Sequence, residues 1–169
     1  MTSPNGIVWT LRTPATPGQQ WQSVTFGTGL FVAVSSGPAA ARIMTSPDGV
    51  TWTLRSDVDA NGVAYSSVTF GNGAYIAVGN GKAIRSTDGI AWDDLADTDI
   101  DATSWNAIAY GDTRFIAVAN GKAITSTDGI TWTVTPKPVL TATGRITDWN
   151  GFLVGEPGAI VRNNRILVY

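Results

Sequence analysis

The sequence contains no cysteine and no histidine in its 169 residues. Without cysteine there can be no disulfide, no thiolate metal site and no cysteine nucleophile. Without histidine the chain lacks the commonest general base and the commonest transition-metal ligand. A single glutamate, Glu156, leaves little material for the paired carboxylates of glycosidase chemistry. The sequence therefore predicts a protein that is not an enzyme and that holds no cofactor and no metal.

Charge is also sparse. Charged residues make up 14% of the chain, the net charge is -2, and the basic residues form no cluster. Nucleic acid requires clustered Lys and Arg, so we expect no nucleic-acid partner. No apolar run approaches the length of a membrane span, and "MTSPNGIVW" lacks the basic region and apolar core of a signal peptide. We expect no membrane contact and no export through an ordinary signal peptide.

What the chain does contain is a repeat. A seven-residue motif reads SPNGIVW, SPDGVTW, STDGIAW and STDGITW, and it ends at Trp9, Trp52, Trp92 and Trp132. These tryptophans lie 43, 40 and 40 residues apart, and a weaker copy follows at 159–169. A period of this length indicates one supersecondary unit copied in tandem.

Each period predicts four short strands. In the first period these strands are 21–27, 30–35, 41–46 and 50–55, rich in Val, Thr, Phe and Trp and bounded by Gly, Asn, Asp or Pro. No window shows a sustained 3.6-residue period, so we expect almost no helix. Four-stranded units of about 40 residues are typical of the blades of a β-propeller.

The predicted fold is therefore all-β, a single propeller domain over residues 1–169 with four blades of four antiparallel strands each. The predicted blades span 21–56, 65–96, 105–135 and 144–169. Residues 1–12 are predicted to add an extra N-terminal strand. Four blades are few for a closed ring, so we expect steeply tilted blades or closure with another chain.

The two ends of the chain predict an oligomer or a docked complex. The runs "IVW" near the N-terminus and "ILVY" at the C-terminus are apolar, and an exposed apolar edge strand seeks a partner. The alternative is that residues 6–12 form a fifth strand at the edge of the last blade within one monomer.

The repeated motif suits a tight turn between the third and fourth strands. Its Asp can accept hydrogen bonds from backbone N–H groups, its Ser can add another, and its Gly can take a positive φ. We expect the Trp ring to lie between one blade and the next. Because a catalytic group is rarely needed in several identical copies, we interpret the motif as scaffold. The predicted structural turn residues are Ser46, Asp48, Gly49, Trp52, Ser86, Asp88, Gly89, Trp92, Ser126, Asp128, Gly129 and Trp132.

The motif is similar to the Asp-box of BNR-repeat propellers, shortened by one residue because Asp and Gly are adjacent here. Sialidases and sortilin-type receptors carry that box. The longer text "SVTFGNGAYIAVG…STDGITW" more closely resembles the propeller-like repeats of bacteriophage structural and tail-associated proteins. The resemblance implies a propeller whose boxes are structural turns away from the ligand face. It also implies a place in the virion, after synthesis in the host cytoplasm.

Two alternatives remain open. Trp21, Tyr65 and Trp105 recur at the start of the first strands, where they could stack on sugar rings, although packing between blades is favoured. The acidic stretch 93–101 could bind Ca²⁺, although a solvated loop is favoured. We expect a non-enzymatic structural or attachment component of a phage particle that binds other virion proteins or copies of itself. The alternative is a lectin-like propeller that binds a host-surface glycan.

Overall fold

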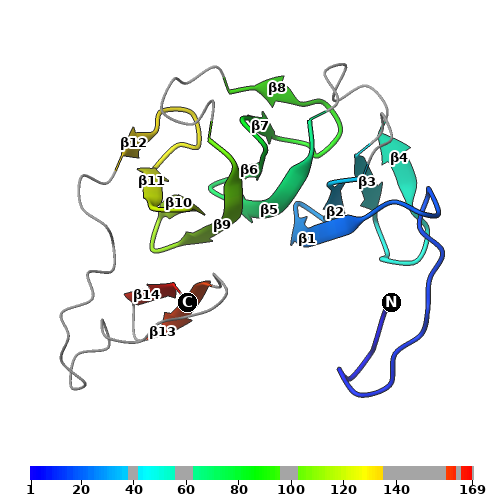
Figure 1. The fold of residues 1–169 in the computed structure, drawn as a ribbon. Coiled ribbons are helices and arrows are strands. Elements are labelled where there is room, and N and C mark those ends of the chain that lie inside the picture. The colour runs from blue at the N-terminus through cyan, green and yellow to red at the C-terminus, as the bar shows by residue number, and fades with distance from the viewer. Residues whose placement is uncertain (38–41, 56–62, 96–102, 135–158, 163–164, 169) are drawn as a thin grey trace.

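Three four-stranded antiparallel sheets form the body of the protein, as the computed structural model shows for residues 1–37, 42–55, 63–95 and 103–134 and for two further strands (Figure 1). In each sheet the spatial order of the strands follows the chain. The first sheet, blade 1, contains β1 (Trp21–Gly27), β2 (Leu30–Ser35), β3 (Ile43–Ser46) and β4 (Thr53–Arg55).

The second and third sheets repeat this arrangement. Blade 2 contains β5 (Tyr65–Gly71), β6 (Ala74–Gly79), β7 (Ala83–Ser86) and β8 (Asp93–Asp94). Blade 3 contains β9 (Trp105–Gly111), β10 (Arg114–Ala119), β11 (Lys122–Ser126) and β12 (Thr133–Val134). These sheets confirm the all-β class and the four-stranded unit that the repeats predict.

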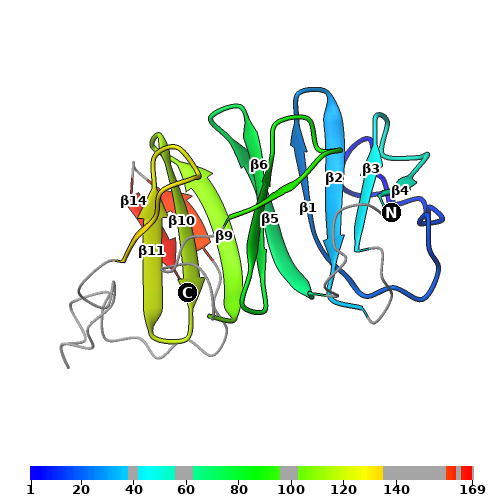
Figure 2. The same cartoon turned by 90° about the horizontal axis from the view of Figure 1, so that it is seen from above.

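The blades stack in chain order with their first strands innermost. β1 packs against β5, and β5 packs against β9, so the sheets fan around a common centre as propeller blades do (Figures 1 and 2). Each inner strand carries an irregularity near its start, as between Trp21 and Ser23 in β1. Such bulges increase the local twist of a strand.

The hydrophobic core lies between the blades. The second strand of one blade faces the next blade: Val32 and Val34 of β2 pack against Tyr65 and Val68 of β5. Between blades 2 and 3 the same places are taken by Ile76, Val78, Trp105 and Ile108. β6 is buried along its whole length, because blade 2 has a blade on either side.

The N-terminal segment differs from its prediction. Residues 1–12 form a hairpin rather than a single extra strand, because the turn at Asn5 folds the chain back on itself. The N–H of Thr2 donates to the carbonyl of Thr10 at 2.9 Å, and the N–H of Thr10 donates to the carbonyl of Thr2 at 2.8 Å.

The fourth predicted blade is described only in its outer half. β13 (Ala159–Arg162) and β14 (Arg165–Val168) pair antiparallel, as its third and fourth strands should. The two strands predicted within 144–158 lie outside the described residues. Among the residues that the structure describes, no helix is long and apolar enough to cross a membrane.

Candidate functional site

The turn of blade 2 shows what the repeated motif does. Ser86 Oγ accepts a hydrogen bond from the N–H of Gly89 at 2.8 Å and donates to Asp88 Oδ1 at 2.9 Å. The same carboxylate oxygen accepts from the N–H groups of Ile90 at 2.8 Å and Ala91 at 2.9 Å. The motif therefore ties down the backbone that links β7 to β8, as the scaffold interpretation expects.

The motif repeats this geometry wherever it occurs. The other two turns place the same contacts on Ser46, Asp48, Gly49, Ser126, Asp128 and Gly129. In the N-terminal hairpin Asn5 takes the place of Asp, and its Oδ1 accepts from the N–H groups of Ile7 at 2.9 Å and Val8 at 3.0 Å. Because Asn5 is uncharged, the turn requires an acceptor oxygen at this position and not a charge.

These hydrogen bonds also set the acidity of the motif carboxylates. Donation from the N–H groups of Ile90 and Ala91 lowers the pKa of Asp88 below its usual range. Backbone donors in the corresponding turns lower the pKa of Asp48 and of Asp128 for the same reason. A general acid at neutral pH needs a raised pKa, so the repeated carboxylates are poorly suited to that role.

The motif tryptophans complete an aromatic ladder in each blade. In blade 2 the rings of Phe70 and Tyr75 lie 4.7 Å apart between centroids, and those of Tyr75 and Trp92 lie 6.4 Å apart. The Nε1–H of Trp92 also donates to the carbonyl of Gly89 at 3.2 Å. The ladders of blades 1 and 3 are Phe26, Phe31 and Trp52, and Tyr110, Phe115 and Trp132. Trp92 and Trp132 also pack against the cores between blades, as predicted.

The three aromatics considered for glycan stacking do not share one exposed face. Tyr65 and Trp105 are 1% and 2% exposed and pack between blades, which leaves no access for a sugar ring. Trp21 is half-buried and lines a cavity instead. The structure thus places two of the three candidates where the packing alternative puts them.

The acidic stretch is only partly described. Asp93 and Asp94 form β8, and the carboxylate of Asp94 lies 2.6 Å from Lys82 Nζ. The other acidic residues of 93–101, like Glu156, lie outside the described residues. Within the described part of the chain, no three His, Cys, Asp or Glu side chains gather as metal ligands.

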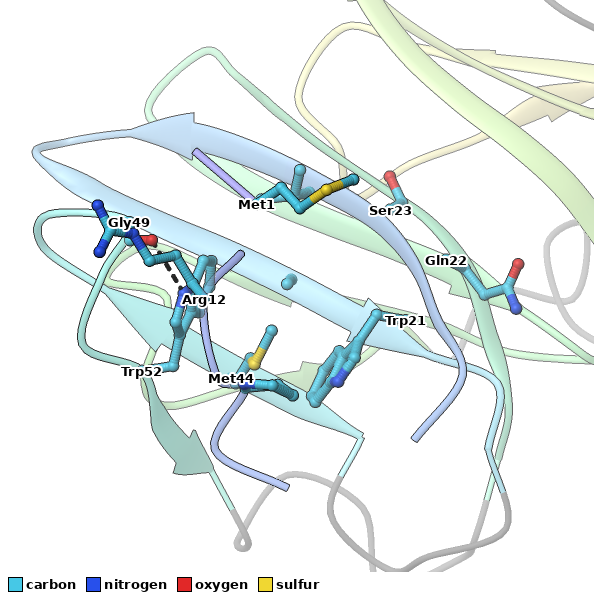
Figure 3. A pocket seen from close by; sticks show the side chains of 11 residues that line it. Met1, Arg12, Trp21, Gln22, Ser23, Met44, Gly49 and Trp52 are labelled. Atoms are coloured by element: carbon cyan, nitrogen blue, oxygen red, sulfur yellow. Dashed lines mark hydrogen bonds between the residues drawn. The ribbon is translucent and has the colours of Figure 1, made fainter. Parts of the chain in front are cut away.

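A cavity of about 340 Å³ opens on the face of blade 1 that is turned away from blade 2 (Figure 3). The N-terminal hairpin contributes Met1 and Arg12 to its wall, and blade 1 contributes Trp21, Met44 and Trp52. Sequence reasoning missed this cavity. The available signal was that residues 1–12 repeat residues 44–55, which places a second copy of the same hairpin beside the first blade.

The surface beside this cavity is apolar. In the N-terminal hairpin Ile7 is 81%, Trp9 56% and Leu11 81% exposed. On β1, Val24 and Phe26 are also more than half exposed. Hairpin and strand together form what we call the N-terminal apolar surface (Ile7, Trp9, Leu11, Val24 and Phe26).

Known proteins of similar sequence or structure are propellers. The family profile described as the DUF6242 beta propeller domain matches residues 3–104. YCF48 bound to the D1 peptide has a TM-score of 0.56 at 21% identity, covering 69% of this chain and 40% of that chain. Virginiamycin B lyase from Staphylococcus aureus has a TM-score of 0.59 at 14% identity, covering 74% of this chain and 44% of that chain.

The computationally designed protein Ika4 has a TM-score of 0.61 at 11% identity, covering 96% of this chain and 92% of that one. No curated protein matches the sequence. The chain spans less than half the length of YCF48 and of the lyase. At these identities the likeness shows the fold alone. It confirms the resemblance to propellers, and none of the matches named here is a phage protein.

Proposed function

We propose that this chain, which belongs to the DUF6242 beta propeller domain family, is a non-enzymatic structural or attachment module that binds another protein through its N-terminal end. The observation that supports this most is the N-terminal apolar surface, where Ile7 and Leu11 are each 81% exposed. Several large apolar side chains exposed on neighbouring segments are typical of a site of protein interaction. Peptide binding is also a use of this fold in YCF48, which has been solved with the D1 peptide.

The repeated turns support a scaffold without chemistry. Each motif carboxylate is engaged by backbone N–H groups of its own turn, and its pKa is lowered rather than raised. The same turn recurs with Asn5, which cannot act as an acid. We therefore expect no hydrolysis of a fluorogenic sialoside above background. Turnover that disappears in Glu156→Gln would contradict this expectation.

The setting that we propose is a bacteriophage particle, with other virion proteins or copies of the chain itself as partners. The phage setting is supported only by the sequence of the repeats. We also propose that residues 144–169 form a fourth blade, since β13 and β14 pair as its outer strands. These two proposals are independent of each other.

A lectin-like function is the second candidate. Its support is the cavity of blade 1, whose wall includes Trp52 next to Arg12 and, further along, Trp21 (Figure 3). A glycan array probed with the full chain, and with Trp21→Ala as the control, tests it. A glycan that binds the full chain and fails to bind the variant would favour the lectin and weaken the structural proposal.

The experiment for the main proposal compares the full chain with a variant carrying Ile7→Ser, Trp9→Ser and Leu11→Ser. Sedimentation at micromolar concentrations should show concentration-dependent association of the full chain, and the variant should be monomeric with unchanged circular dichroism. The matched control is Ile130→Ser, because Ile130 occupies the same turn position and is 53% exposed but lies in blade 3. It should associate like the full chain. A full chain that stays monomeric throughout would contradict association through this surface.

A further inference from the structure

The N-terminal hairpin is a copy of the outer half of a blade. Residues 1–12 differ from residues 44–55 only at positions 5, 7 and 8. The pairing is also the same, since Thr2 pairs with Thr10 as Thr45 pairs with Thr53. The chain therefore carries a third and a fourth strand at its N-terminal end that do not belong to blades 1–3.

In a complete blade the outer hairpin rests on two inner strands. β3 pairs with β2 over Ile43–Ser46, and the ring of Trp52 lies 6.5 Å from that of Phe31 on β2. Trp9 is the counterpart of Trp52, and it keeps the hydrogen bond from Nε1–H to the carbonyl of Gly6 at 3.2 Å. Among the described residues, however, Trp9 has no aromatic neighbour, and it is 56% exposed. What Trp9 lacks is the aromatic of a second strand.

In the part of the chain that the structure describes, no blade covers the face of blade 1 beside this hairpin. Val24 of β1 is 59% exposed, whereas its counterparts Val68 and Ile108 are 5% and 7% exposed. Those two are covered by the preceding blade, whose serines accept hydrogen bonds from their N–H groups: Ser23 from Val68 and Ser67 from Ile108, each at 3.2 Å. Val24 occupies the same position on its first strand as Val68 and Ile108. The element that would bury Val24 is therefore an inner strand of a blade placed before blade 1.

A cavity of about 340 Å³ lies between the hairpin and blade 1 (Figure 3). It corresponds to roughly ten water molecules, since one water occupies about 30 Å³ of the liquid. This volume is smaller than a strand, so the hairpin must move outward from blade 1 to admit one. Trp21 lines this cavity, and its Nε1 is buried with no hydrogen-bond partner in the part of the chain that the structure describes, which is unusual for a buried donor.

The blades themselves define what fits. Each inner hairpin that covers a neighbouring blade has a Gly at the end of its first strand, because the next ring stacks there: a Cβ on Gly27 would overlap Phe70, and a Cβ on Gly71 would overlap Tyr110. Its second strand carries an aromatic at its second position, followed by Val or Ile, any residue, and Val, as in Phe31–Val34.

In sequence, residues 1–169 contain no further hairpin that keeps this pattern outside blades 1–3. The inner hairpins of blades 1–3 are already paired with their own outer strands. In the last repeat, Trp149 stands where the Gly belongs, Leu153 where the aromatic belongs, and Glu156 where the second Val belongs. The sequence of that repeat thus departs from the pattern at all three positions.

We propose that residues 1–12 and the uncovered face of blade 1 form an acceptor site for the two inner strands of a propeller blade, donated by another polypeptide. The inference rests on the proposed function and specifies its partner as a β-hairpin of the form aromatic-Gly-x-x-x-aromatic-(Val or Ile)-x-Val, the pattern that blades 1–3 share. Pairing uses the free edge of the strand around Thr2, and burial covers Trp9, Val24 and Phe26. The site thus joins backbone pairing with apolar burial, as strand addition does elsewhere.

The probe is a fluorescent peptide with the sequence of residues 19–36, the hairpin that covers the equivalent strands in blade 1. Added to the full chain, it should bind saturably at one per chain, measured by fluorescence anisotropy. Binding should weaken by about tenfold or more when the peptide carries Phe31→Ser, and also when the chain carries Trp9→Ser. Ile130→Ser in the chain should leave binding unchanged.

A fusion protein provides a second test that uses no free peptide, which could aggregate. Residues 19–43 are fused ahead of Met1, so that the junction reproduces the sequence of blade 1. The fusion should raise the melting temperature and shield Trp9 from acrylamide, judged against Trp9→Phe. The same fusion with Phe31→Ser in its added copy should do neither.

Each contrary result has a distinct meaning. If neither peptide nor fusion engages the full chain, the acceptor site is refuted. If the peptide binds only after removal of residues 144–169, the chain's own C-terminal segment is the occupant and the inference is wrong. If the chain associates with itself through residues 1–12 and the peptide does not compete, a second copy is the occupant. That last result overturns the inference and leaves the proposed function standing.

Discussion

Residues 1–12 and 44–55 carry nearly the same sequence but lie in different surroundings. In both hairpins the Arg Nε donates to the Thr Oγ1, at 3.0 Å for Arg12 and 2.9 Å for Arg55. Leu11 is nevertheless 81% exposed, whereas its counterpart Leu54 is half-buried. The comparison shows that local hydrogen bonds determine the shape of the hairpin and that the inner strands provide its burial.

The same contrast holds one layer inward. Val24 and Ile108 occupy equivalent places on the first strands of blades 1 and 3, yet one is 59% and the other 7% exposed. Their sequences give no hint of this difference, because the cover of each comes from the preceding blade. Blade position along the chain, rather than residue type, decides what is exposed.

The largest expected effect separates these two positions. Ile108→Ala should destabilise the protein by about 2–4 kcal/mol, because it removes buried methyl groups and leaves a cavity between blades 2 and 3. Val24→Ala should change the free energy of unfolding by less than about 0.5 kcal/mol, as exposed positions do. Urea unfolding of both variants measures the difference. Equal losses would show that Val24 is covered in solution and would break the comparison.

The second largest expected effect concerns the contact between the inner strands of blades 2 and 3. Gly71→Ala should cost about 1–3 kcal/mol, because the added Cβ overlaps the ring of Tyr110 from the next blade. A double-mutant cycle with Tyr110→Ala should show coupling between the two sites. Additive losses would mean that the ring does not rest on this glycine.

The turn motif should matter less per residue. We expect Asp88→Ala and Asp128→Ala each to destabilise by about 1–2 kcal/mol, because each removes an acceptor from two backbone N–H groups. Asp88→Asn is the matched control, since Asn5 holds the same turn, and it should cost much less. Either alanine variant that keeps its melting temperature but loses partner binding would contradict the scaffold role.

The smallest expected effect is on pH dependence. The pKa values of Asp48, Asp88 and Asp128 are lowered from 3.8 in the folded protein. Their stabilisation is therefore complete above that unfolded value and is lost as the pH falls through the lower folded pKa. The effect is modest because solvent screens these exposed carboxylates. The triple Asp→Asn variant should lose less stability on acidification, measured by thermal melts. An identical acid profile would mean that other groups control it.

Much of the fold was predictable because it is local. In blades 1–3 the first two strands match their predicted bounds, as at 21–27 and 30–35 in blade 1, since Gly and Asn delimit them. The turn roles of Ser86, Asp88 and Gly89 also follow from chemistry within a few residues. The extra N-terminal strand predicted at 1–12 is a hairpin instead, because the amide oxygen of Asn5 holds the same turn as the Asp of the other copies.

The candidate site was not predictable in the same way. Burial of Tyr65 and Trp105, and exposure of Val24, depend on which blade precedes each one. The repeats make those blades look alike in sequence, so only the assembled structure separates a covered face from an open one. The cavity at Trp21 likewise depends on how the N-terminal hairpin lies against blade 1, which the sequence does not specify.

Hydrogen exchange of the full chain tests the central claim most directly. Mass spectrometry can compare the amides of 1–12 with those of 44–55 under identical conditions, and the near-identical sequences make the intrinsic rates similar. The amides of residues 1–12 should exchange about tenfold faster or more than those of 44–55, because only the hairpin 44–55 rests on the inner strands of a blade. Equal protection of the two hairpins would show that residues 1–12 are already covered, and the account of an open blade would be wrong.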